Sequence, residues 1–366
     1  MTEALLRNHN VDVLRGLAVT AVVCHHLFAH TGLAVPFLDR FGGLLGVQLF
    51  FLVSGFLIVQ SAASSGLLAY LLRRVLRIFP LYWLVVLGWS AWYGKLDADL
   101  LPLKWPDFLA NWLALSHFVP AALFDFDVLT VSWTLSIELA WYALVPWIVY
   151  LAGQRSGRHF WLEMACIALL VSTIWVWLAQ RGMLDFLYAG ALARAGISPV
   201  SDFGRFAFVV NAFPAQLVFF GIGAALWRYR TAMSRLPSGL LLVLIVVFAG
   251  WPEHWNQWLH LNPSPASGLG LAALFVLVLR QQQWRLSLLK WLGKISYPVY
   301  LLHVPVLLLV FQQWQFTGLG AAVLAISITL LASTGLHHWV ERPCIAWGRL
   351  LTSSGTRPYA PSSPAL

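Results

Sequence analysis

Charged residues are scarce in this 366-residue chain: Asp, Glu, Lys and Arg make up 10% of it, whereas 60% is hydrophobic. A soluble domain carries about 25% charged residues, so too few charges are present to cover a soluble body of this size. Cysteine is also sparse, and Cys24, Cys166 and Cys344 lie far apart, so neither a disulfide framework nor a thiolate metal site is indicated. The same composition excludes a disordered chain and a collagen-like chain. We therefore predict an all-α, polytopic membrane protein.

Apolar runs of about 20 residues, the length that spans a bilayer, recur along the chain. Ten of them are candidate transmembrane helices, at residues 12–30, 42–60, 79–94, 131–151, 160–180, 206–227, 238–252, 266–281, 296–314 and 317–336. An eleventh apolar stretch, 107–123, is interrupted by Asn111, His117 and Pro120. Whether that stretch crosses decides the orientation of every later helix.

The basic residues, 23 Lys and Arg against 14 Asp and Glu, decide between the two topologies. They are scattered between apolar runs instead of forming a patch, so they indicate membrane orientation and not a nucleic-acid partner. If the N-terminus is cytoplasmic and 107–123 does not cross the membrane, all but six of the 23 basic residues lie on the cytoplasmic side. The six on the outer side are Arg40, Lys95, Lys104, Arg181, Arg194 and Arg205. We predict about ten transmembrane helices plus a re-entrant or interfacial segment, both termini cytoplasmic, in a domain of residues 1–350 followed by a disordered tail, 351–366.

Ionisable side chains at membrane depth are costly, so they mark candidate functional positions. Arg15 and His26 are eleven residues apart in the first span, which places them on one helix face about 16 Å apart along the axis. Arg15 is expected at the cytoplasmic mouth and His26 in the outer half of the membrane. A snorkelling arginine and a structurally satisfied histidine are the less favoured interpretation.

Glu138 is the acidic counterpart in the fourth span, with Thr134 and Tyr142 one turn away on the same face. Counted from the outer surface it reaches a depth similar to that of His26. An acid and a histidine at matching depths predict a general base whose imidazole is oriented by the carboxylate. A structural buried ion pair is the alternative.

Four further groups of residues are less specific. Arg74 and Arg77 lie three apart in LLRRVLRIFPLYW, where guanidinium groups suit phosphate but a plain topology anchor is favoured from the residues alone. In the ninth span Ser296, Tyr300 and His303 form one polar stripe, and for His303 catalytic and structural roles are equally open. Ser54 and the glycines of GVQLFFLVSGFLI are expected to serve close packing, and Trp251, Trp255 and Trp258 to anchor at the membrane interface.

Taken in order, the segments RGLAVTAVVCHH, GVQLFFLVSGFLI, RRVLRIFP, WTLSIE, ISYPVYLLH and the late ERP resemble the membrane-bound acyltransferase-3 family over residues 10–345. The resemblance implies transfer of an acyl group, most often acetyl, from cytosolic acyl-CoA to a hydroxyl of an envelope or exported glycan at a bacterial inner membrane. The family's Arg-x10-His element corresponds to Arg15 and His26, and its Arg-x-x-Arg element to Arg74 and Arg77. Its buried acid corresponds to Glu138, whereas Gln48 departs from the acidic residue that relatives often carry.

The resemblance makes phosphate binding the favoured role of Arg74 and Arg77. The expected catalytic pair is His26 and Glu138, and acetyl-CoA is expected to bind through Arg15, Arg74 and Arg77. The expected supporting residues are Ser54, Tyr142, Tyr300 and His303. The expected partners of the protein are a glycan or lipid-linked saccharide acceptor and membrane lipids, and no bound metal is expected. One-step transfer and a transient acyl-histidine both remain open. The rival function is a transporter or flippase that uses the buried Arg, His and Glu as a proton relay.

Overall fold

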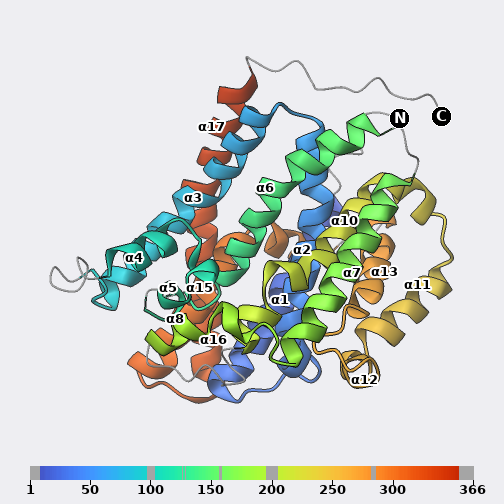
Figure 1. Ribbon diagram of the computed structural model, residues 1–366. Coiled ribbons are helices and arrows are strands. Elements are labelled where there is room, and N and C mark those ends of the chain that lie inside the picture. Colours follow the sequence, from blue (N-terminus) through green and yellow to red (C-terminus); the bar gives the residue numbers. More distant parts are fainter. Residues whose placement is uncertain are drawn as a thin grey trace.

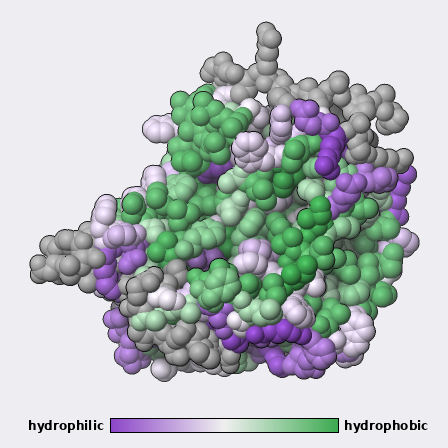
Figure 2. Space-filling view, in the orientation of Figure 1, coloured by the Kyte–Doolittle hydropathy of each residue, from purple (hydrophilic) through white to green (hydrophobic). Residues whose placement is uncertain are grey.

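The computed structural model describes residues 9–96, 104–125, 127, 129–155, 159–194, 205–281 and 286–353. Within these ranges the chain is a bundle of helices with no strand (Figure 1). Side chains on the face shown in Figure 2 form a broad hydrophobic band, with hydrophilic side chains toward the upper right and lower edges. Large apolar side chains such as Leu68, Trp147 and Leu331 point outward with more than two thirds of their surface exposed. The chain is thus an integral, multi-pass membrane protein of the all-α class, as predicted.

Eight helical segments of the described chain are long and apolar enough to cross a membrane. They are α1 (His9–Thr31), α2 (Leu38–Ala63), α3 (Leu67–Trp92), α6 (Trp133–Gln154), α7 (Phe160–Gln180), the π-helical η4 (Phe206–Val210) with α10 (Phe213–Met233), α15 (Ser296–Leu308) with η6 (Leu309–Gln313), and α16 (Gly318–Leu336) with η7 (His337–Glu341) and α17 (Arg342–Ser353). Each overlaps one of the predicted spans, although α3 begins twelve residues before the predicted span 79–94 and the last segment continues beyond the predicted span 317–336.

The two remaining predicted spans are present as irregular elements. The first comprises α11 (Ser238–Leu244) and η5 (Ile245–Ala249), which meet α12 (Pro252–Trp258) at a bend of 63°. The second is α13 (Ser267–Arg280), an apolar helix of 14 residues. A helix of that length rises about 21 Å, which is shorter than the hydrocarbon core. By length and composition, eight helical segments of the described chain qualify as spans, or nine if the bent pair is one span, whereas about ten spans were predicted.

The interrupted stretch 107–123 forms no continuous helix. It falls into α4 (Trp105–Trp112), the short 3₁₀ turn η2 (Ser116–Phe118) and α5 (Pro120–Asp125), of which α4 is the longest at eight residues. None of these elements qualifies as a span, in agreement with the predicted re-entrant or interfacial segment. The other short elements are η3 (Asp185–Leu187), α8 (Ala189–Arg194) and α14 (Ser287–Lys294).

Helix α17 and the predicted tail overlap by three residues. The helix continues to Ser353, so the tail does not begin at 351. Residues 354–366 of the predicted tail lie outside the described residues. The Arg73 Nε donates to the Thr352 hydroxyl at 2.7 Å, which ties the end of α17 to the first turns of α3. We call the end of the bundle that holds this contact the inner end, because it carries the arginines predicted to be cytoplasmic.

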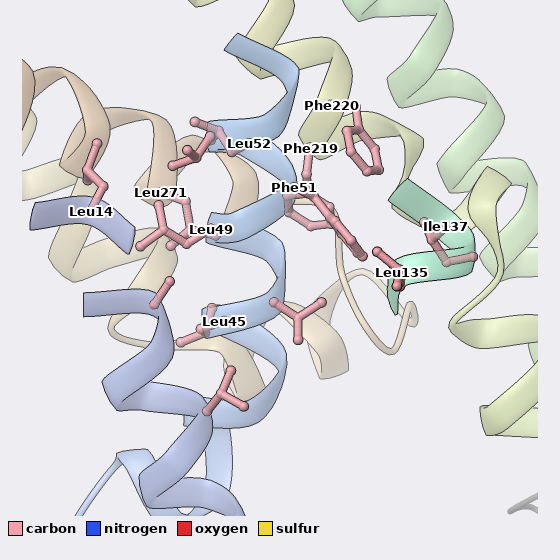
Figure 3. Close-up of a cluster of buried hydrophobic side chains, with 14 of the residues drawn as sticks. Leu14, Leu45, Leu49, Phe51, Leu52, Leu135, Ile137, Phe219, Phe220 and Leu271 are labelled. Carbon is pink, nitrogen blue, oxygen red and sulfur yellow. The ribbon is translucent and has the colours of Figure 1, made fainter. Parts of the chain in front are cut away.

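Helix α2 occupies the centre of the bundle and packs against α1, α6, α10 and α13. Leu45, Leu49 and Leu52 point from one of its faces toward α1 and α13, while Phe51 points from the opposite face toward Phe219 and Phe220 of α10 (Figure 3). This two-sided burial explains why its sequence is apolar all round. Any polar side chain on α2 must therefore face a partner or a cavity.

Close approach of α2 and α10 depends on two glycines. A Cβ atom on Gly55 would fall on the Phe220 carbonyl oxygen, and one on Gly223 would fall on the Leu52 carbonyl oxygen. Small residues at such crossings let two backbones touch. The predicted packing role is confirmed for Gly55 of the GVQLFFLVSGFLI segment.

Candidate active site

A cavity of about 250 Å³ lies toward the inner end of the bundle, between α1, α2, α3, α6 and α15. We call it the inner cavity. Three cationic side chains line it, Arg15 from α1 and Arg74 and Arg77 from α3, together with one carboxylate, Glu138 from α6. The other polar lining residues are Ser54, Ser132, Thr134, Tyr142, Ser296, Tyr297 and Tyr300. The excess of arginine makes this cavity suited to an anionic ligand.

Arg74 is held in place at one edge of its guanidinium group. Its Nη2 donates to the Ser61 hydroxyl at 3.0 Å, and the group lies 5.9 Å from the ring centres of both Tyr70 and Tyr142. The Tyr70 hydroxyl in turn donates to the Tyr142 carbonyl at 2.9 Å. The Nε of Arg74 is buried with no partner among the described residues. A positioned guanidinium with an unused donor is a ready partner for phosphate oxygens.

A second cavity, of about 460 Å³, lies toward the opposite end of the bundle, and we call it the outer cavity. His25 and His26 of α1 line it with Gln48 of α2. Trp133, Asn211, Trp255, Asn256, Gln257, Asn262, Ser264 and Ser267 complete most of its polar and aromatic lining, together with the ion-paired Arg40 and Glu253. Amide, hydroxyl and aromatic groups therefore dominate this cavity, in contrast to the arginines of the inner one.

The two cavities share a wall. Val47, Val131 and Tyr300 line both of them. Tyr300 is fixed there because the Thr134 hydroxyl donates to its hydroxyl oxygen at 2.9 Å. Thr134 lies one turn from Glu138 on α6, so the wall joins the acidic helix to the histidine-bearing helix α15. A molecule in one cavity is thus separated from a molecule in the other by a few side chains.

His26 is oriented by His303 across the contact between α1 and α15. The Nδ1 of His26 lies 3.2 Å from the Nε2 of His303 and 3.0 Å from the Val22 carbonyl oxygen. The Nδ1 of His303 lies 2.7 Å from the Tyr300 carbonyl oxygen, which only accepts, so that nitrogen carries the proton. The Nε2 of His303 is then an acceptor for the His26 Nδ1–H. This leaves the His26 Nε2 with a free lone pair, the form a general base requires.

An ionisable residue just before α6 was not singled out from the sequence. The Oδ1 of Asp127 accepts from the backbone N–H groups of Leu129 at 3.2 Å and Thr130 at 3.0 Å, while its Oδ2 is buried without a partner among the described residues. Burial raises the pKa of Asp127 to about 6. Its place at the end of an interrupted apolar stretch was visible in the sequence, but its burial was not.

A family model described as an acyltransferase domain matches residues 8–338, nearly the whole chain. The chain belongs to the acyltransferase-3 family. Its curated relatives include the acyltransferase MdmB of Streptomyces mycarofaciens, which is 25% identical over 94% of this chain and 93% of MdmB. The exopolysaccharide production protein ExoZ of Rhizobium meliloti is 25% identical over 84% of this chain and 91% of ExoZ.

A third relative is longer than this chain. The peptidoglycan O-acetyltransferase OatA of Listeria monocytogenes is 22% identical over 91% of this chain but only 55% of OatA. The chain spans about half the length of several of the relatives it matches. No solved structure matches it.

Most of the residues singled out in this acyltransferase-3 chain come together at the two cavities. Arg15, Arg74, Arg77, Glu138, Tyr142 and Ser54 line the inner cavity, Tyr300 lines both, and His26 lines the outer one. His303 lies behind His26 with 1% of its surface exposed. The Ser54 hydroxyl is buried with no partner among the described residues, so it offers the inner cavity a free donor in addition to its small size.

The expected contact between His26 and Glu138 is replaced by another. His26 hydrogen-bonds Val22 and His303, and Glu138 lines the other cavity. Depth along two helix axes was estimated from the sequence, but the neighbour that each helix faces was not. Helix α1 packs against α2, α14 and α15, whereas α6 packs against α2, so the residue that meets His26 comes from α15.

The tryptophans of the outer loop differ in their surroundings. Trp255 lines the outer cavity, where its Nε1 donates to the Val247 carbonyl at 2.7 Å and its ring stacks on Phe248. Trp251 and Trp258 are exposed over more than 60% of their surfaces. Interface anchoring therefore suits the latter two, and Trp255 is placed to contact a ligand. Among the described residues no group of three or more His, Cys, Asp or Glu is arranged to hold a metal ion.

Proposed function

We propose that this chain transfers an acetyl group from acetyl-CoA, which enters from the cytoplasm, to a hydroxyl of an envelope or exported glycan. The observation that carries the proposal is the pair of cavities, one rich in arginine and one containing a histidine base, that meet at the wall of Val47, Val131 and Tyr300. The O-acetyltransferase and exopolysaccharide names of the relatives support acetyl as the group and a glycan as the acceptor.

The donor half of the reaction belongs to the inner cavity. Arg74 and Arg77 lie near the start of α3 at the inner end, where the phosphates of a cytosolic thioester would arrive. Arg15 adds a third guanidinium group on α1, about 16 Å below His26 by helix rise. Glu138 partly offsets these charges, so that the cavity need not hold three unpaired cations when the donor is absent. The pantetheine arm would extend from the arginines toward the shared wall.

The acceptor half belongs to the outer cavity. The His26 Nε2 takes the proton from the glycan hydroxyl as its oxygen attacks the thioester carbonyl carbon. A new C–O ester bond forms, the C–S bond breaks, and coenzyme A leaves as the thiolate, which recovers the proton from His26. His303 acts as a positioning residue that holds the His26 ring in the required tautomer. Glu138 acts in this scheme on the donor side, through the charge of the inner cavity.

Purified protein in nanodiscs tests the proposal when it is given radiolabelled acetyl-CoA and a glycan acceptor. The wild type is expected to transfer label to the acceptor or to hydrolyse the thioester slowly. His26→Ala is expected to lower the rate by 10²- to 10⁴-fold, the usual contribution of a general base. A transporter would leave the thioester intact in both proteins, and that result would overturn the proposal.

A further inference from the structure

Two buried amide side chains in the outer cavity have hydrogen-bonding atoms that the protein does not use. Gln48 of α2 is fully buried, and its Nε2 has no partner among the described residues. Asn211, between η4 and α10, is 6% exposed, and its Oδ1 also has none. Buried polar groups in proteins are nearly always hydrogen-bonded, so two exceptions in one cavity point to a ligand that satisfies them.

The Gln48 amide is held so that its free end is fixed. The Ser267 hydroxyl of α13 lies 2.9 Å from the Gln48 Oε1 and 3.1 Å from the Ser264 carbonyl oxygen, so its one hydrogen is shared between these two acceptors, and the Gln48 Nε2 group is the unpaired end. Gln48 offers a donor and Asn211 offers an acceptor. A saccharide hydroxyl both accepts and donates, so hydroxyl groups of one sugar match this combination.

The charges of the outer cavity favour an uncharged sugar. Its lining contains one arginine and one carboxylate, Arg40 and Glu253, and they form an ion pair at 2.7 Å. Among the described residues, the other ionisable side chains that line the cavity are His25, His26 and Tyr300. A uronic acid or a phosphorylated sugar would meet no free cation there. Trp133 and Trp255 add aromatic faces of the kind on which a sugar ring packs.

We propose that Gln48 and Asn211 bind hydroxyl groups of an uncharged saccharide residue and so select the acceptor. This inference rests on the proposed function and names its substrate class. The cavity volume of about 460 Å³ falls within the range of about 300–1,000 Å³ typical of small-molecule sites. The same cavity contains His26, so a sugar held by the two amides has its hydroxyls near the base.

The test compares neutral and anionic trisaccharides as acceptors for the full chain in nanodiscs with radiolabelled acetyl-CoA. Maltotriose and N,N′,N″-triacetylchitotriose are the neutral probes, and trigalacturonate is the anionic one. The wild type is expected to use at least one neutral probe at least tenfold better than trigalacturonate. Gln48→Glu, which is nearly isosteric but lacks the N–H donor, and Asn211→Leu are each expected to lower kcat/KM for that saccharide about tenfold.

Controls separate acceptor binding from folding and from the donor half. The KM for acetyl-CoA and the thioester hydrolysis without saccharide are expected to stay unchanged in both variants. Gln313→Met changes a glutamine that is exposed and lies outside both cavities, and it is expected to behave as wild type. Unchanged saccharide kinetics in both cavity variants, or a preference for trigalacturonate, would overturn the inference.

The two proposals fail in distinguishable ways. If acetyl-CoA is hydrolysed or used but neither neutral probe is labelled, the inference is wrong and the donor half of the proposed function stands. If no acetyl-CoA is consumed with any acceptor, the proposed function is wrong and the inference falls with it.

Discussion

A neutral imidazole supports His26 differently from the way a carboxylate would. The His303 Nε2 and the Val22 carbonyl oxygen both accept from the His26 Nδ1–H and so fix its tautomer, but neither carries a negative charge to stabilise an imidazolium. Because removal of His303 takes away one of these two buried contacts, it should cost about 1–1.5 kcal/mol, or roughly tenfold in rate. The base would thus depend on geometry more than on charge.

Substitution of His303 tests this dependence. His303→Leu is expected to lower kcat about tenfold and to leave the KM for acetyl-CoA unchanged, because His303 does not line the inner cavity. His303→Gln, whose side-chain oxygen still accepts a hydrogen bond, is expected to recover part of the loss. Steady-state kinetics on the three proteins in nanodiscs provide the measurement. Equal loss in both variants would assign His303 a packing role instead.

Arg74 allows a second measurement at the residue scale. Its guanidinium group lines the inner cavity with a buried Nε that has no partner among the described residues, so its removal should weaken donor binding. Arg74→Ala is expected to raise the KM for acetyl-CoA about tenfold, the cost of one charge-assisted hydrogen bond, with a smaller effect on acceptor use. Arg349→Ala, an exposed arginine outside this cavity, is the matched control. An unchanged donor dependence would return Arg74 to the role of a topology anchor.

Single residues of the site were predictable wherever the bilayer makes them costly. Arg15, His26 and Glu138 stood out because charge or imidazole in hydrocarbon needs a purpose, and all three line cavities. Gln48 and Asn211 carry no charge, so the same argument gave them little weight. The partner of His26 could not be found from one helix at a time, since a periodicity gives the face of a helix and not the neighbour it meets.

At the element scale, hydropathy located the helices and missed their irregularities. Every predicted span has a helix at its position, but α13 is only 14 residues long and α11 bends toward α12 by 63°. The length of an apolar run indicates that a segment is buried in the membrane or the protein core, but it does not indicate whether the helix bends within that run. Both irregular elements border the outer cavity, to which Ser267 and Trp255 contribute.

The crossing of α2 and α10 sets the position of Gln48 and the outer cavity. Gly55→Val is expected to force the two helices apart, because its side chain would overlap the Phe220 backbone. Overpacking of this kind typically costs about 1–3 kcal/mol, seen as a lower Tm in detergent. Gly88→Ala in α3, where a Cβ atom would meet nothing within 4 Å, is the control and should keep or raise the Tm. A Gly55→Val protein as stable as wild type would show that this crossing can relax.

At the scale of the whole molecule, the arrangement of the cavities predicts a direction for the proposed reaction. The arginines of α3 lie at the inner end, where the Arg73 side chain meets Thr352, and α12 with its Glu253 to Arg40 ion pair lies at the opposite end (Figure 1). Donor and acceptor would therefore approach from opposite sides of the membrane and meet only at the shared wall. An enzyme with a single open cleft would accept both from the same side.

Sealed proteoliposomes distinguish these two arrangements, because neither acetyl-CoA nor a trisaccharide crosses a bilayer unaided. With acetyl-CoA outside and maltotriose trapped inside, label is expected in the trapped sugar, transferred by those molecules whose inner end faces outward. With both compounds outside, no transfer is expected from either orientation of the protein. Detergent permeabilisation should restore activity in the second case, which shows that the protein was competent. Transfer in sealed vesicles with both compounds on one side would contradict the two-cavity mechanism, since one cavity would then have to admit both substrates.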